Sequence, residues 1–103
     1  MARVNPPFIM GPLSLVWFQE AMKLPGAALS VAIILWFYQG LNKSPTFKIG
    51  TGDIANYTGH SRDTAQRGLR ELERHGLITV ERFPGKKHIV TIQEEKSLYE
   101  NQA

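Results

Sequence analysis

The stretch that decides the fold runs from Asp53 to Gly76 and reads DIANYTGHSRDTAQRGLRELERHG. Its second half carries the start and stop signals of one helix. Ser61 can cap the N-terminus, because its hydroxyl can accept a hydrogen bond from the amide of Asp63 or Thr64. Gly76 follows the last periodic residue, where a left-handed backbone commonly ends a helix. The sequence therefore predicts a helix between Ser61 and Gly76.

The two faces of this helix differ in chemistry. Ala65, Leu69 and Leu72 recur at the spacing of one apolar stripe, which predicts that this face packs against a core. Gly68 lies on the same crowded side, where a bare Cα allows another helix to approach; the alternative is that glycine is simply tolerated there. The other face is polar and rich in arginine: Arg62, Gln66, Arg67, Arg70 and Arg74.

A shorter helix is expected before the turn, around residues 54–57. It should end at Gly59, because a tight turn between two helices favours a glycine. Thr51 or Asp53 is available to cap its start. Two helices joined in this way form a helix-turn-helix, although an ordinary helical hairpin with a solvated basic face has the same local pattern.

The segments around this pair of helices favour the first interpretation. Residues 77–82 and 88–92 alternate apolar and polar side chains, with the strong turn signal Pro84-Gly85 between them, and so predict a β-hairpin. Residues 46–49 alternate in the same way and can pair as a third strand. Helix, strand, helix, helix, hairpin is the order of a winged helix, and the agreement between independent signals supports it.

Two apolar segments precede this unit. Residues 14–24 predict a helix with apolar residues on two faces, which suits contact with a core and a second subunit, or with one core alone. Residues 27–42 predict a core helix; its aromatic residues 36–38 are typical of a core, with a ligand pocket as the alternative. The residues expected at a dimer interface are Leu15, Trp17, Phe18, Met22, Val31, Leu35 and Tyr38.

These signals divide the chain into three parts. We expect residues 1–11 to form an N-terminal arm or a loose terminus, because Asn5-Pro6-Pro7 resists both helix and sheet. Residues 12–92 form one α+β, mainly α, domain: a winged helix-turn-helix with a three-helix core, a β-hairpin wing and an extra N-terminal helix. Residues 93–103 form a polar, acidic tail, frayed or disordered, or anchored through Leu98 and Tyr99.

The composition favours an anionic partner over an enzyme. The chain has 103 residues, a net charge of +3 and no cysteine, so a cysteine-ligated metal site and a disulfide framework are excluded. The histidines His60, His75 and His88 lack metal-ligand spacing, and no serine has an evident His–acid set. We expect no catalytic residue, metal or cofactor. No secretory signal is evident and the apolar run 27–38 is too short for a bilayer, so we expect a cytoplasmic protein.

The span from Pro12 to Ile92 resembles small bacterial winged helix-turn-helix proteins, many of them uncharacterised. The features that carry the resemblance are Pro12-Leu13-Ser14-Leu15, Leu24-Pro25-Gly26, Leu35-Trp36-Phe37, Gly40-Leu41, Ser61-Arg62-Asp63 and residues 69–85. Residues 69–78 are also similar to the end of the recognition helix in MarR-type and GntR-type regulators. The resemblance implies the fold more than the function, because winged helices serve repressors, replication initiators and protein adaptors. His60 departs from the small apolar residue expected there, and places an imidazole near a phosphate.

We expect the helix Ser61–His75 to enter a major groove of double-stranded DNA, with the wing on the backbone or minor groove. Arg62, Thr64 and Gln66 are candidates for base edges, and Arg67 for a base or a phosphate. Asp63 can orient Arg67 by an i,i+4 ion pair. The residues expected to contact DNA are Thr51, His60, Ser61, Arg62, Asp63, Thr64, Gln66, Arg67, Arg70, Arg82, Lys86 and Lys87.

The expected function is that of a dimeric transcriptional regulator, a repressor, that binds an inverted repeat. One recognition helix reads too few base pairs for selective binding, which favours two-fold symmetry. The alternative is a protein-interaction or accessory module in plasmid replication, partition or conjugative transfer, as mobile elements use. That module would bind its partner through the aromatic N-terminal face.

Overall fold

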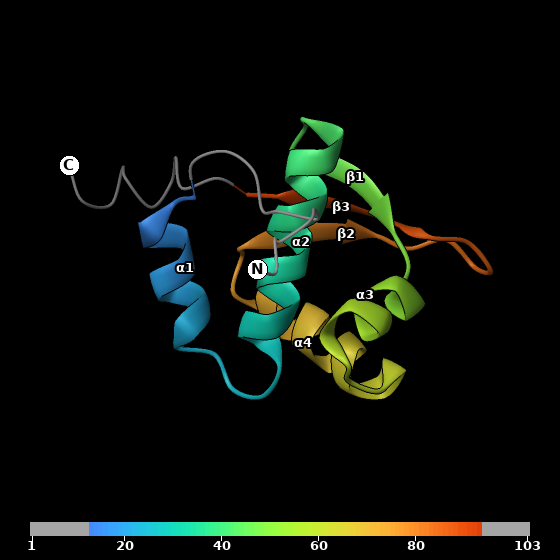
Figure 1. The fold of residues 1–103 in the computed structure, drawn as a ribbon, viewed down its shortest axis with the longest axis horizontal. Helices are drawn as coiled ribbons and strands as arrows, with labels where there is room; N and C mark the ends of the chain where they lie inside the picture. The colour runs from blue at the N-terminus through green and yellow to red at the C-terminus, as the bar shows by residue number, and fades with distance from the viewer. Residues whose placement is uncertain (1–12, 94–103) are drawn as a thin grey trace, which may run out of the picture.

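The computed structural model describes residues 13–93, which form four helices and one three-stranded sheet (Figure 1). The elements are α1 (Leu15–Met22), α2 (Ala28–Asn42), β1 (Thr46–Ile49), α3 (Thr51–Thr58), α4 (Arg62–Arg74), β2 (Ile78–Glu81) and β3 (His88–Ile92). This is the predicted winged helix-turn-helix, mainly helical, with an extra N-terminal helix. None of the helices within residues 13–93 is long and apolar enough to cross a membrane. The predicted arm, residues 1–11, and the tail beyond Gln93 lie outside the described residues.

The ends of α4 follow the predicted capping signals. The Ser61 hydroxyl accepts a hydrogen bond from the Thr64 amide at 3.1 Å, which satisfies one of the free amides of the first turn. At the other end, Gly76 has a φ of 75°, and Gly59, which ends α3, has a φ of 79°. A left-handed backbone of this kind favours glycine. Local chemistry therefore sets the length of the second helix and the turn before it.

Helix α3 begins before the residues 54–57 around which the sequence predicted it. Its first residue is Thr51, two positions before Asp53. The reason is that the Asp53 carboxylate accepts a hydrogen bond from the Gly50 amide at 3.0 Å. A carboxylate at the third helical position stabilises the start of a helix in this way, so Asp53 acts on the N-terminus from inside the helix.

The sheet has the order β1-β3-β2, and both pairs of strands are antiparallel. Strand β3 lies in the middle, with Phe47 of β1 opposite Val90 and Val80 of β2 on the other side. Phe47 and Val90 are buried, while Lys48 is exposed, as the alternating pattern predicted. Figure 1 shows the β2–β3 loop extending past the helices, which makes it a wing.

Helix α2 forms the centre of the core and packs against α1, α3, α4 and the sheet. Trp17 of α1 is fully buried on it. The Trp17 ring meets Phe18 and Trp36 edge to face, with ring centroids 5.0 and 5.5 Å apart. Its indole Nε1 donates a hydrogen bond to the Leu77 carbonyl at 3.0 Å. The aromatic residues around α2 therefore form a packed core, the first of the two predicted alternatives.

This packing corrects the predicted dimer interface. Four of its seven residues lie in the core of the chain itself, at 8% exposure or less: Trp17, Phe18, Val31 and Leu35. They are buried because α2 packs on α1, α4 and the sheet, so they are not available to a second subunit. Leu15 and Met22 remain exposed on α1, at 65% and 57%. Tyr38 is partly buried, with its ring 5.9 Å from that of Phe47.

Gly68 marks the close approach of α4 to α2. A Cβ built there would lie 2.8 Å from Val31 Cγ2 and 3.0 Å from the Ala27 carbonyl oxygen. We expect Gly68→Ala to lower the unfolding temperature, because overpacking of about 1–3 kcal/mol outweighs the roughly 1 kcal/mol gained in helix propensity. Thermal unfolding followed by circular dichroism measures this. Gln66→Ala on the polar face is the control, and a Gly68→Ala midpoint at or above that of the wild type would contradict the close packing.

Candidate nucleic-acid interface

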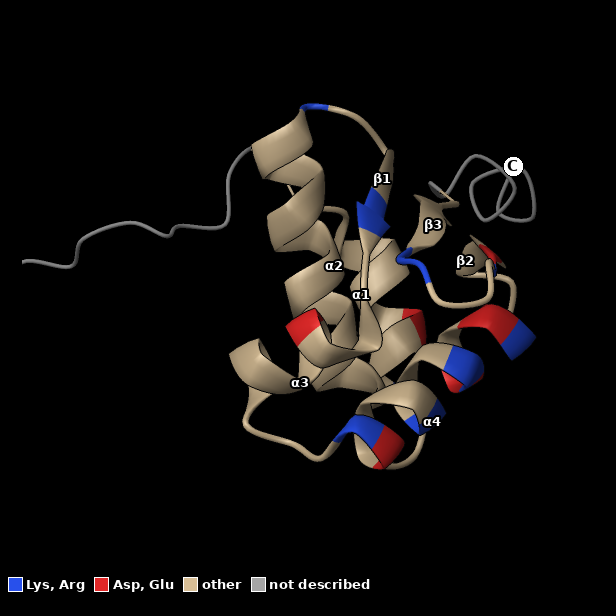
Figure 2. Ribbon diagram, turned by 90° about the vertical axis from the view of Figure 1, so that its right-hand side faces the viewer, with Lys and Arg blue, Asp and Glu red and all other residues tan. Residues whose placement is uncertain are grey.

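One face of α4 presents the side chains that were predicted to contact DNA. Arg62, Arg67 and Arg70 are exposed, and Thr64 and Gln66 are partly buried. The opposite face is buried, as predicted from Ala65, Leu69 and Leu72. Figure 2 shows blue bands on α4 and on the loop that joins β2 to β3. The helix therefore offers a polar, arginine-rich surface to solvent, with acidic residues beside the basic ones (Figure 2).

Two side chains near the start of this surface are already oriented. Arg67 Nη2 lies 2.7 Å from Asp63 Oδ2, the predicted i,i+4 ion pair. Both side chains are highly exposed, so the pair adds little to stability, but it holds the guanidinium along the helix. Ser61 Oγ also donates a hydrogen bond to Thr64 Oγ1 at 3.0 Å. Thr64 thus keeps a fixed hydroxyl one turn from the helix N-terminus.

Arg62 lies against α3 in this structure. A Cβ built on Gly52 would be 3.1 Å from Arg62 Nη2 and 3.4 Å from its Cζ, so the guanidinium rests over a bare Cα. Gly52 was not among the predicted site residues, because a glycine before a helix resembles an ordinary linker in sequence. Its contact with Arg62 directs that side chain from the start of α4 toward the wing.

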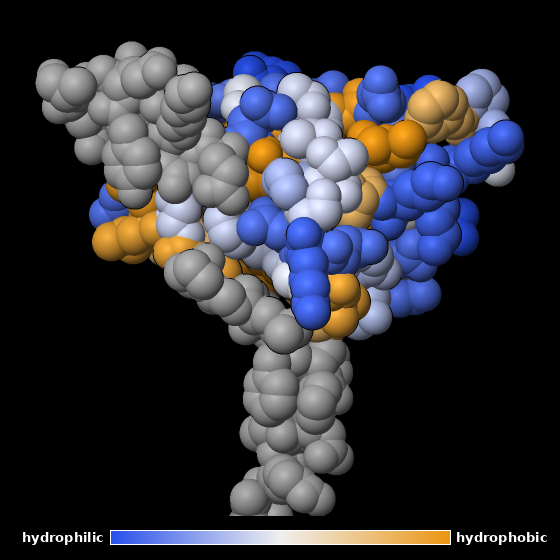
Figure 3. All heavy atoms as spheres, turned by 90° about the horizontal axis from the view of Figure 1, so that it is seen from above, coloured by the Kyte–Doolittle hydropathy of each residue, from blue (hydrophilic) through white to orange (hydrophobic). Residues whose placement is uncertain are grey.

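A hollow of about 740 Å³ separates the wing from the first turns of α3 and α4. Its lining brings together residues from three parts of the chain: Gly50, Thr51, Gly52, Arg62, Arg82, Phe83, Pro84, Gly85, Lys86, Lys87 and His88. Figure 3 shows hydrophilic side chains gathered on the right, where the wing lies in Figure 1, and hydrophobic ones at the left edge. The hollow is cationic and solvent-exposed, which suits a polyanion.

His88 is a residue of this hollow that the sequence did not single out. Its Nε2 lies 3.4 Å from Thr51 Oγ1, and its buried Nδ1 has no hydrogen-bond partner within residues 13–93. His60, by contrast, was predicted to lie near a phosphate but does not line the hollow. Its amide donates a hydrogen bond to Thr58 Oγ1 at 3.3 Å in the inter-helix turn.

Two wing cations that were predicted for DNA contact are paired with carboxylates in the structure. Arg82 donates two hydrogen bonds to Glu73 of α4, Nη2 to Oε1 at 2.8 Å and Nη1 to Oε2 at 3.2 Å. Lys87 Nζ lies 3.2 Å from Asp53 Oδ2 of α3. The wing is thus tied to both helices of the helix-turn-helix. Sequence spacing gave no signal for either pair, because each joins elements that only the fold brings together.

Comparison with known families agrees with this geometry. Residues 31–100 match the family described as the Crp-like helix-turn-helix domain. The chain belongs to this family. No curated protein matches the chain. Membership confirms the predicted helix-turn-helix DNA-binding class, without support for the MarR or GntR type in particular.

The match also defines what belongs to the shared domain. It begins within α2 and covers α3, α4 and the wing, so the hollow and the arginine face both lie inside the Crp-like domain. Helix α1 precedes the matched span and packs on it through Trp17. The candidate interface is therefore separate from α1.

Hydrogen bonds and ion pairs lower the pKa of two carboxyl groups in the Crp-like domain, Glu73 and Asp53. Hydrogen bonds from Arg82, with its charge and that of Arg70, hold the pKa of Glu73 below its ordinary 4.5 against partial burial. The pKa of Asp53 is held below 3.8, first by the Gly50 amide and then by Lys87. Hydrogen bonding to the charged form favours that form, so both groups are ionised at neutral pH.

These shifts predict how stability depends on pH. A carboxyl with a lowered folded pKa stabilises the protein above its unfolded pKa, and this contribution is lost as the pH falls through the folded pKa. We expect Asp53→Ala to lower the free energy of unfolding by about 1 kcal/mol at about pH 7, through loss of the cap. The loss should shrink toward zero at about pH 2.

Urea unfolding at the two pH values measures this difference. Glu20→Ala is the control, because Glu20 forms an exposed ion pair with Lys23 on α1 at 3.2 Å and caps no helix. An Asp53→Ala loss that stays the same at both pH values would show that the carboxylate charge is not the stabilising group.

Proposed function

We propose that this chain is a sequence-specific transcriptional regulator that binds double-stranded DNA through Ser61–His75 in the major groove. The observation that carries the proposal is the position of the wing hollow beside the N-terminal half of α4. When α4 lies in the major groove of a duplex, the DNA backbone comes close to the cations of the hollow. The contacts of α4 with the bases then give sequence discrimination, and the contacts of the hollow with phosphates give affinity.

The side chains divide into two groups under this proposal. Arg67, held by Asp63, and Arg62 are suited to the O6 and N7 atoms of guanine, and Gln66 to the N6 and N7 atoms of adenine. Arg62 moves off Gly52 to reach a base, which breaks no ion pair in residues 13–93. The residues for the phosphate backbone are Thr51, Arg70, Arg82, Lys86 and Lys87.

The regulator acts as a homodimer and a repressor in this proposal. Leu13, Leu15 and Met22 keep 46%, 65% and 57% of their surface exposed. They lie on or beside α1, on the side of the molecule away from α3 and the wing (Figure 1). Contact between two α1 helices would bury this apolar surface and leave both α4 helices free for an inverted repeat. Light scattering at micromolar concentration tests this, with the mass of two chains expected and the mass of one chain as the contrary result.

The alternative, a protein-interaction module, has less support. It was expected to bind a partner through Trp17 and Trp36, and both side chains are buried in the core. On α1, a partner could reach the exposed Leu15 and Met22, which the proposed dimer also needs. Of the two functions, only the DNA-binding regulator gives a role to the arginines on the polar face of α4.

Selection of random duplex DNA by the purified protein tests the proposal. We expect enrichment of an inverted repeat with guanine in each half-site. Weak, salt-sensitive binding without an enriched motif would overturn it, because phosphate contacts alone give affinity without sequence preference.

A further inference from the structure

Three arginines surround one carboxylate near the C-terminal end of α4. A hollow of about 420 Å³ is lined by Arg70, Glu73, Arg74 and Arg82. Both carboxylate oxygens of Glu73 accept hydrogen bonds from the Arg82 guanidinium, at 2.8 and 3.2 Å. Arginine binds a phosphate group with the same two-pronged geometry. The hollow therefore already holds an anionic group, and that group belongs to the protein.

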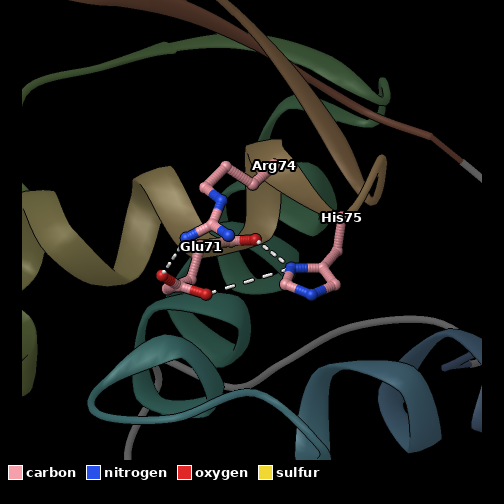
Figure 4. A network of polar contacts seen from close by, with 3 residues as sticks. All are labelled: Glu71, Arg74 and His75. Atoms are coloured by element: carbon pink, nitrogen blue, oxygen red, sulfur yellow. Dashed lines mark hydrogen bonds and ion pairs between the residues drawn. The ribbon is translucent and has the colours of Figure 1, made fainter.

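The charges around Glu73 leave this hollow cationic. Arg74 Nη1 lies 3.1 Å from Glu71 Oε2. Figure 4 shows that Glu71 also lies close to His75, whose Nδ1 is 3.0 Å from the Glu71 carbonyl oxygen and 3.9 Å from its carboxylate. Glu71 is thus shared between two neighbours on its own helix. Arg70 has no ion pair among residues 13–93.

The bond between Arg82 and Glu73 can be exchanged for another partner. The two side chains are 37% and 34% exposed, so water and dissolved ions reach them. Exposed ion pairs contribute little net stability, and a phosphate group offers more acceptor oxygens than a carboxylate. A ligand phosphate can therefore replace Glu73 at Arg82 without disturbing the core.

We propose that this hollow is a second phosphate-binding subsite, and that Glu73 occupies it in the free protein as an internal competitor of DNA. The proposal rests on the DNA-binding function proposed above. When a duplex lies along α4, a backbone phosphate takes the place of the Glu73 carboxylate at Arg82, and Arg70 and Arg74 bind its other oxygens. Glu73 thereby lowers the affinity for any sequence, and the base contacts of the N-terminal half of α4 then supply a larger share of the binding free energy.

The test compares wild type, Glu73→Gln and Glu20→Gln, each as the full chain, by fluorescence anisotropy with a random-sequence duplex at low salt. We expect Glu73→Gln to bind about 3- to 10-fold more tightly, because one more cation becomes free for a phosphate. Glu20→Gln makes the same charge change in the Lys23 pair on α1 and should stay within about 2-fold of the wild type. Equal gains for the two variants would show an effect of net charge alone and overturn the inference.

A second pair of variants tests the role of Arg82. In an Arg82→Gln background, the gain from Glu73→Gln should fall below about 2-fold, since the competitor acts through that guanidinium. A gain that persists there would overturn the inference. The inference is also overturned if the wild type binds DNA and Glu73→Gln binds no more tightly. That result would leave the proposed DNA-binding function intact. If no variant binds any duplex at low salt, the proposed function fails and the inference fails with it.

Discussion

Replacing Trp17 by alanine should lower the free energy of unfolding by about 3–5 kcal/mol, the usual cost of removing a buried large aromatic side chain. Trp17 is fully buried and packs edge to face on Phe18 and Trp36. Its loss leaves a cavity between α1 and α2 and also leaves the Leu77 carbonyl without its indole donor. In a small domain with about 5–15 kcal/mol of total stability, this is a large fraction.

Urea unfolding followed by circular dichroism measures the effect. Gln19→Ala is the matched control, because Gln19 is on the same helix and exposed, and it should change stability by about 0.5 kcal/mol or less. If the two variants lose the same amount, α1 is not part of the folding unit. The expected result makes α1, which precedes the matched span 31–100, a structural component of this domain.

The second large effect is expected in DNA binding. Arg67→Ala and Arg62→Ala should each weaken binding to the selected duplex by about 10- to 100-fold, because one bidentate contact to a base contributes about 1–3 kcal/mol of discrimination. Random-sequence duplex should lose far less affinity, since it relies on phosphate contacts. Repeating the selection with each variant should show relaxed preference at one position of each half-site.

Lys23→Ala provides the control for charge, because Lys23 is the C-cap of α1 and its side chain is 69% exposed. It removes one positive charge at a distance from the proposed DNA contacts of α4 and the wing, so binding should stay within about 2-fold of the wild type. If Arg67→Ala selects the same motif with undiminished affinity, α4 is not the helix that contacts the bases. This conclusion would hold even though the fold is that of a winged helix.

Local chemistry explains why so much of the fold could be predicted from the sequence. Each of the signals that were predicted correctly acts over only a few residues of the chain. They are the Ser61 cap, the left-handed Gly59 and Gly76, and the alternation in residues 46–49. Signals of this range are visible in the sequence, and the elements that they predict lie where expected. The ion pair between Asp63 and Arg67 was predictable for the same reason, since one helical turn brings them together.

Contacts between distant elements could not be predicted. Glu73 with Arg82, and Asp53 with Lys87, meet only because the wing folds back on the helix-turn-helix. The apolar excess of α1 had two equally good explanations, and the pattern alone could not separate a core from an interface. The structure assigns Trp17 and Phe18 to the core and leaves Leu15 and Met22 for a proposed partner.

Titration of the ¹⁵N-labelled protein with the selected duplex, followed by NMR, tests most directly whether α4 and the wing form the DNA-binding surface. We expect changes in amide chemical shift to concentrate at the start of α3, in residues 62–70 and at the wing tip. The amide shifts of the buried residues of α1 should stay unchanged. Shifts confined to α1, with α4 unaffected by saturating duplex, would contradict this expectation.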